Sequence, residues 1–192
     1  MSSVLAHDPE LVAKIASHYE EIIRLIGEDP AREGLVKTPV RAAKALLDIT
    51  SGYKVEAIDV ARQAVFEHEG SKLVMVKDIE FYSICEHHLL PFFGKISIGY
   101  IPENKIIGLS KLGRIVDAFA KRLQVQERLT AQICRLLSEA MPVKGVIVAC
   151  TAEHLCMKMR GVEKQDSATT TYDYNGLFES DIELRKEFLS LL

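Results

Sequence analysis

The chain has 192 residues, of which 48% are hydrophobic and 27% charged, and its formal net charge is −3. This length and composition suit one globular domain, or a domain with a helical appendage, that buries a sizeable core. The slightly acidic balance argues against a general nucleic-acid binder. No apolar run approaches the ~20 residues of a membrane span, and residues 1–8 carry no secretion signal. We therefore expect a cytoplasmic protein without membrane or nucleic-acid partners, whose four cysteines are reduced.

The first part of the chain predicts two helices. Asp8-Pro9-Glu10 combines an N-cap acceptor, a proline at the first helical position and an acid in the first turn. Thr38-Pro39 begins a second helix in the same way, after a loop over residues 27–34. Arg41 and Lys44 are three residues apart on that helix and share a face. This basic face is either simply solvated or part of a binding site.

From about residue 72 the hydrophobic period changes from helical to strand-like. Alternating apolar residues predict strands around 73–84 and 96–100, with Pro91 and Gly94 marking a turn between them. Ser110 is a candidate N-cap for one helix, and a second helical run ends near Met141. Further strands are predicted at 145–150, 155–159 and 168–174, and a capping box at Ser180 predicts a C-terminal helix. Strands in adjacent pairs indicate an α+β fold with an antiparallel sheet, so we expect an N-terminal helical region (1–65) followed by an α+β domain (66–192).

The stretch Cys85-Glu86-His87-His88 is the strongest candidate for chemistry. Cys85 and His88 could reach one Zn²⁺, which prefers sulfur and nitrogen ligands, and Cys156 is the best third ligand. Three protein ligands leave the fourth tetrahedral position to water, as in catalytic zinc sites. His87 and His154 lie beside these ligands, where proton donors and acceptors are needed. The alternative is a turn that carries solvated histidines and a buried free cysteine. The other two cysteines, Cys134 and Cys150, lie in apolar runs and are predicted to be core residues.

Basic and polar residues elsewhere suggest an anionic ligand. Lys111 and Arg114 fall in the first turn of the helix that begins near Ser110, and helix N-termini attract phosphate. If the segment after Cys156 is a strand, Arg160 lies ~13 Å along it from the metal. Neither a P-loop nor a dinucleotide-binding glycine motif is present. In Gln124-Val125-Gln126-Glu127, a carboxylate beside an amide could bind the N–H edge of a guanine-like ring. Alternatively, this is an ordinary junction between two helices, where Glu127 pairs with a neighbouring basic side chain.

Taken together, these segments resemble the GTP cyclohydrolase I family. The matching stretches cover about residues 27 to 190, and the most specific are Cys85-Glu-His-His-Leu-Leu-Pro-Phe-Phe-Gly94, Gly108-Leu-Ser-Lys-Leu112, Arg122-Leu-Gln-Val-Gln-Glu-Arg-Leu-Thr130 and His154-Leu-Cys-Met with Met159-Arg-Gly161. Residues 166–172 match only loosely, so we assign them no role. The long N-terminal extension of animal members is not present, so feedback regulation by a partner protein is not expected.

The resemblance implies a tunnelling-fold (T-fold) subunit, with two helices packed on its sheet, that converts GTP to 7,8-dihydroneopterin triphosphate and formate, the first step of pterin and tetrahydrofolate biosynthesis. It implies Zn²⁺ on Cys85, His88 and Cys156, with His154 and His87 in proton transfer. Gln126 and Glu127 would hold the guanine edge. The residues expected at the triphosphate are Ser110, Lys111, Arg114, Arg160, Arg41 and Lys44. The resemblance also implies a homodecamer of two stacked pentamers, and a sheet of about four strands with two exposed edges gives an independent motive for assembly.

The sequence argues against two other functions. A zinc-stabilised pterin or purine sensor would need a closed site with four ligands, whereas the sequence offers three ligands and two spare imidazoles. A zinc nucleobase deaminase would carry His-x-Glu and Pro-Cys-x-x-Cys motifs, and the sequence has neither.

Overall fold

The computed structural model describes residues 7–70 and 72–192, and these form two compact units that divide between Ser51 and Gly52. The sequence placed the division at residue 65, but helix α3 (Ala57–Arg62) belongs to the larger unit because it buries Ala57 and Ala61 in that unit's core. The prediction that the N-terminus carries no secretion signal concerns mainly residues 1–6, which lie outside the described residues. Within that part, every helix is too short or too polar to cross a bilayer.

The smaller unit contains the two predicted helices. Helix α1 (Pro9–Leu25) begins as expected, because the Asp8 carboxylate accepts a hydrogen bond from the Glu10 N–H at 3.0 Å. Helix α2 (Thr38–Ile49) has its proline in the first turn but no side-chain cap at its N-terminus. The two helices pack through a small core of Val12, Ala16 and Ala43. A 3₁₀ helix, Ser51–Lys54, lies at the boundary between the units.

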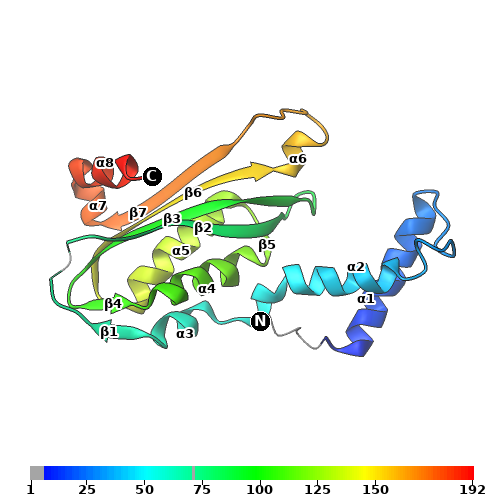
Figure 1. Ribbon diagram of the computed structural model, residues 1–192, viewed down its shortest axis with the longest axis horizontal. Coiled ribbons are helices and arrows are strands. Elements are labelled where there is room, and N and C mark those ends of the chain that lie inside the picture. Colours follow the sequence, from blue (N-terminus) through cyan, green and yellow to red (C-terminus); the bar gives the residue numbers. More distant parts are fainter. Residues whose placement is uncertain (1–6, 71) are drawn as a thin grey trace. The chain divides into compact units, whose positions relative to one another are not determined.

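The larger unit is built on a five-stranded sheet in the order β5-β2-β3-β6-β7 (Figure 1). Strands β2, β3, β6 and β7 pair antiparallel, and the short β5 pairs parallel to β2. A separate two-stranded ladder joins β1 to β4. The strand bounds are β1 Val65–Glu67, β2 Val74–Cys85, β3 Pro91–Pro102, β4 Lys105–Ile107, β5 Leu123–Gln124, β6 Val143–His154 and β7 Thr169–Gly176.

Helices cover both faces of this sheet. Helices α4 (Leu109–Ala120) and α5 (Gln126–Ala140) pack on one face, and α7 (Leu177–Ser180) and α8 (Ile182–Ser190) lie on the other (Figure 1). Alternate residues of β6 divide between the two cores, since Val146 and Val148 belong to the α4/α5 cluster while Ile147 packs with Phe178 and Phe188. Burial on both faces explains why β6 is an almost continuous apolar run. The predicted α+β class with an antiparallel sheet is therefore confirmed.

Several local predictions were wrong. Pro91 begins strand β3 and Gly94 lies within it, because the turn comes earlier, at residues 86–90, with Leu89 at φ 54°. The segment after His154 is a short helix, α6 (Leu155–Lys158), so the 13 Å strand distance to Arg160 does not apply. Ser110 does not cap α4, whose N-cap is Gly108. The N-cap of α8 is Asp181, whose carboxylate accepts from Leu184 N–H at 3.0 Å, and not Ser180.

Candidate active site

The turn after β2 projects the two adjacent histidines from the end of the sheet. Cys85 is the last residue of β2, and its backbone N–H donates to Leu90 O at 2.9 Å while its carbonyl accepts from Leu89 N–H at 2.9 Å. The adjacent Glu86 N–H donates to Gln124 O at 3.0 Å, which ties the turn to β5. The turn is thus held on both sides by backbone hydrogen bonds and returns the chain directly into β3.

The three predicted metal ligands meet at this turn. Strand β6 ends at His154, and the first turn of α6 carries Cys156 back toward Cys85 and His88. One ligand atom from each of Cys85, His88 and Cys156 lies within 4.8 Å of the others. Within residues 7–70 and 72–192 this is the one group of three or more potential metal ligands so arranged. Burial and the adjacent Cys85 thiol both disfavour the thiolate form of Cys156 and therefore raise its pKa.

A recess of about 210 Å³ opens beside these ligands. It is lined by the cysteine pair and by four residues that the sequence had singled out for chemistry or base recognition: His87, Gln126, Glu127 and His154. His87 is largely exposed, and its Nδ1 lies 4.0 Å from Cys85 Sγ. The fold therefore gathers residues from the β2–β3 turn, the start of α5 and the end of β6 around one small volume.

His154 is held by packing as well as by hydrogen bonding. Its ring stacks on Phe92, its partner in the β3–β6 register, with centroids 4.7 Å apart and planes at 3°. Its Nε2 lies 2.8 Å from Gln126 Oε1. Burial lowers the pKa of His154, and the nearby Glu127 carboxylate only partly offsets this. The neutral imidazole is consequently favoured near neutral pH.

Gln126 and Glu127 are adjacent in sequence but occupy different environments. The Gln126 side chain is 1% exposed and engaged with strands β6 and β7, whereas Glu127 is exposed at the recess. A guanine ring in the recess could reach the Glu127 carboxylate. The Gln126 amide, in contrast, has its hydrogen bonds already made within the protein.

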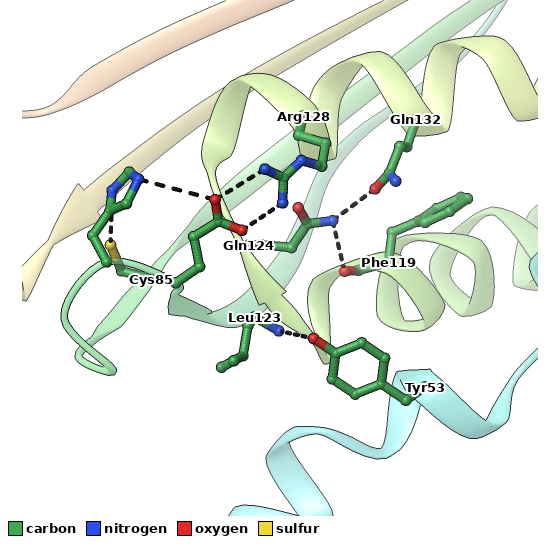
Figure 2. A network of polar contacts seen from close by, with 9 residues as sticks. Tyr53, Cys85, Phe119, Leu123, Gln124, Arg128 and Gln132 are labelled. Carbon is green, nitrogen blue, oxygen red and sulfur yellow. Dashed lines mark hydrogen bonds and ion pairs between the residues drawn. The ribbon is translucent and has the colours of Figure 1, made fainter.

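A polar network behind the turn was not anticipated from the sequence. Arg128 donates two hydrogen bonds to Glu86, at 2.5 and 2.9 Å, and this pairing lowers the pKa of the Glu86 carboxyl. Figure 2 shows Arg128 and Gln132 on α5, with the Gln124 amide between them and Phe119; Gln124 Nε2 donates to Phe119 O at 3.1 Å and to Gln132 Oε1 at 2.7 Å. The sequence suggested that Glu127 could pair with a neighbouring basic residue. The adjacent Arg128 pairs instead with Glu86, which lies between Cys85 and His88 in the sequence. Only the approach of α5 to the turn reveals this pairing.

The residues expected at a triphosphate do not line the recess. Ser110 and Lys111 lie in the first turn of α4, and Arg114 lies in its second turn. Helix α4 begins beside β4, at the end of the larger unit opposite β5 and α6 (Figure 1). None of these three side chains lines the recess of its own chain. Arg160 is exposed just after α6, close enough to Cys156 to lower that thiol's pKa slightly. Arg41 and Lys44 are exposed on α2 of the smaller unit.

The family model and the curated relatives indicate the same family. The family model described as GTP cyclohydrolase I matches residues 15–192. A protein named GTP cyclohydrolase 1 from Porphyromonas gingivalis is 53% identical over 183 residues, which cover 95% of this chain and 94% of that protein. A protein of the same name from Leptospira biflexa is 56% identical over 173 residues, covering 90% and 94% of the two chains. Among solved structures, the archaeosine synthase QueF-Like in its apo form has a TM-score of 0.45 at 17% identity, covering 56% of this chain and 97% of its own.

Proposed function

Since this chain belongs to the GTP cyclohydrolase I family and is an enzyme, we propose that it hydrolyses and rearranges GTP to 7,8-dihydroneopterin triphosphate and formate. Its α+β architecture is the tunnelling fold of that family. The proposed reaction is the first step of pterin and tetrahydrofolate biosynthesis, carried out in the cytoplasm. The observation that carries the proposal is the Cys85–His88–Cys156 cluster at the edge of a recess that also contains His154 and Glu127.

The cluster fits a zinc ion. Two sulfurs and one imidazole nitrogen are the donor types that zinc prefers, and three protein ligands are typical of catalytic sites. Ligands of one tetrahedral zinc ion lie about 3.5–3.8 Å apart, given Zn–S of about 2.3 Å and Zn–N of about 2.0–2.1 Å. Ligand atoms within 4.8 Å of one another need only small side-chain movements to reach that spacing. When bound there, zinc supplies an acidified water for attack on C8 of the purine.

The residues around the recess would bind the base and move protons. Glu127 is exposed at the recess, and its carboxylate can accept hydrogen bonds from the ring N–H and the amino group of guanine. His154 is placed to deliver a proton to the ring nitrogen as the C8–N9 bond opens. His87 has a largely exposed ring near Cys85 and would assist opening of the ribose. The side chain of Gln126 is buried, so in this proposal it does not contact the base but acts through His154.

The triphosphate would be bound by residues from more than one chain. Ser110, Lys111 and Arg114 do not line the recess of their own chain. A neighbouring chain could place the same residues over that recess, with Arg160 beside it and Arg41 and Lys44 contributing. The sheet supports assembly, because β7 pairs only with β6 among the described strands and leaves a long free edge. Closing such edges into a ring fits a homodecamer of two pentamers.

A product assay tests the proposal. Purified protein supplied with Zn²⁺ and GTP should release formate and a pterin that becomes fluorescent after oxidation. The matched control is His154→Ala, which should keep its metal and still bind GTP but lose turnover, because it removes a proton donor and not a ligand. Folded, metal-loaded wild-type protein that releases no formate from GTP would rule out this function.

A further inference from the structure

A set of hydrogen bonds around Gln126 joins the start of α5 to the sheet. The Gln126 Nε2 lies 3.0 Å from Cys150 O, 2.9 Å from Thr169 O and 3.2 Å from Thr171 Oγ1, so its two N–H groups are shared among three acceptors. Backbone carbonyls can only accept hydrogen bonds, so the NH₂ end of the amide must face β6 and β7. The oxygen end therefore points the other way, toward His154.

Two threonine hydroxyls reinforce this orientation. Thr130 is 1% exposed, and its hydroxyl donates to the Gln126 backbone carbonyl at 2.9 Å. A hydroxyl carries one proton, so the 2.7 Å contact between Thr130 Oγ1 and Thr171 Oγ1 must be donated by Thr171. This leaves the Thr171 oxygen as an acceptor for Gln126. Inverting the amide would leave several buried groups unpaired, at a cost of about 1–3 kcal/mol each.

The direction of the last hydrogen bond follows from the others. Gln126 Oε1 can only accept, so the His154 Nε2 at 2.8 Å must carry the proton. The hydrogen bond made by one imidazole nitrogen sets the tautomer of the ring. Stacking on Phe92 fixes the ring plane at the same time. In the part of the chain that the structure describes, no hydrogen bond engages His154 Nδ1.

We propose that Gln126 is a positioning residue that keeps a proton on Nε2 of His154, so that Nδ1 is the nitrogen that exchanges a proton with the substrate. This rests on the proposed function, in which His154 is the proton donor to the purine. Gln126 is neutral and accepts from Nε2–H in both the imidazole and the imidazolium, so it supports the ring before and after proton transfer. In this proposal two residues of the loosely matching segment 166–172 also have a role, because Thr169 and Thr171 orient the Gln126 amide.

Kinetics of Gln126→Met separate positioning from substrate contact. Methionine has nearly the same length but no donor or acceptor, so His154 loses its partner while the metal ligands remain. We expect kcat to fall about ten- to hundredfold, with KM for GTP and the zinc content close to wild type. The control Gln132→Met removes an amide from the same helix that pairs with Gln124, and kcat should stay within about twofold. A raised KM with unchanged kcat in Gln126→Met would overturn the proposal, because it would mean that the amide contacts GTP.

A second pair of variants guards against misfolding of Gln126→Met. Thr171→Val keeps the side-chain shape but removes the hydroxyl that orders the network, so kcat should fall, and Thr171→Ser should restore it. Equal kcat for the two Thr171 variants would count against the network.

The tautomer can also be measured without turnover. Sedimented wild-type protein labelled with ¹⁵N at its six histidines should give, by solid-state NMR, a protonated Nε2 and an unprotonated Nδ1 for His154, assigned by comparison with His154→Ala. In Gln126→Met the two tautomers should mix. A wild-type ring protonated at Nδ1 alone would refute the inference, whether or not the protein converts GTP, so this failure is distinct from failure of the proposed function.

Discussion

Replacing Gly94 by alanine tests how closely β3 and β6 approach at the end of the sheet that carries the metal-ligand cluster. A Cβ at Gly94 would lie 2.0 Å from Thr151 O, 2.7 Å from Ala152 Cα and 2.9 Å from Thr151 C. These are backbone atoms of the partner strand, so no rotamer change relieves the overlap. Overpacking typically costs about 1–3 kcal/mol, and we expect the upper end of this range because strand pairing itself must yield.

Urea unfolding measures this cost. With an m value of about 2 kcal/mol/M, a loss of about 3 kcal/mol lowers the unfolding midpoint by about 1.5 M. The matched control is Gly113→Ala in α4, where an added Cβ meets nothing within 4 Å. Alanine there should raise the free energy of unfolding by about 0.8–1 kcal/mol through helix propensity. If both variants unfolded at the wild-type midpoint, the close approach of β3 and β6 would not exist as described.

Three further predictions concern the recess, the thiols and assembly. Glu127→Gln should weaken the binding of GTP by about 1.5–3 kcal/mol, roughly ten- to 150-fold in affinity, and the binding of ATP far less, since only guanine offers a ring N–H beside an amino group. Equal losses of affinity for both nucleotides would mean that Glu127 has a structural role. Burial raises the pKa of Cys134 and of Cys150 to about 12, so alkylating reagents should modify them only after unfolding, whereas metal-free Cys156 should react in the folded protein; mass mapping of the adducts decides this. Light scattering coupled to gel filtration should show a large homo-oligomer, and a fully active species of 21.5 kDa, the mass of one chain, would contradict a shared site.

The sequence predicted best those features that depend on local chemistry. Asp8 and Pro9 specify the start of α1 through a cap and a fixed backbone angle, and neither requires knowledge of the rest of the chain. The ligand types at Cys85, His88 and Cys156 suggested their meeting, because sulfur and nitrogen donors in a reduced protein have few other shared uses. The T-fold itself entered through the family resemblance and not through the pattern of helices and strands.

Features that depend on a partner segment were missed. The sequence pattern predicts a turn at Gly94, because glycine marks both turns and close backbone approaches, and only the position of β6 distinguishes them. Helix α3 escaped notice because it has six residues and is stabilised mainly by burying Ala57 and Ala61.

The two residues at the start of α5 show the same limit within the site. Gln126 and Glu127 looked like a pair that would share one ligand. Consecutive helical residues point about 100° apart, however, so the Gln126 side chain is buried while that of Glu127 is exposed. The burial of Gln126 beneath β6 and β7 could not be predicted without the sheet.

Metal titration tests the central claim most directly. Protein stripped of metal should be inactive toward GTP, and added Zn²⁺ should restore formate release in proportion to the metal bound, with saturation at one ion per chain. Cys156→Ala should neither bind the ion tightly nor recover activity. Full turnover of GTP by the metal-free protein, or wild-type zinc binding by Cys156→Ala, would contradict a catalytic zinc held by Cys85, His88 and Cys156.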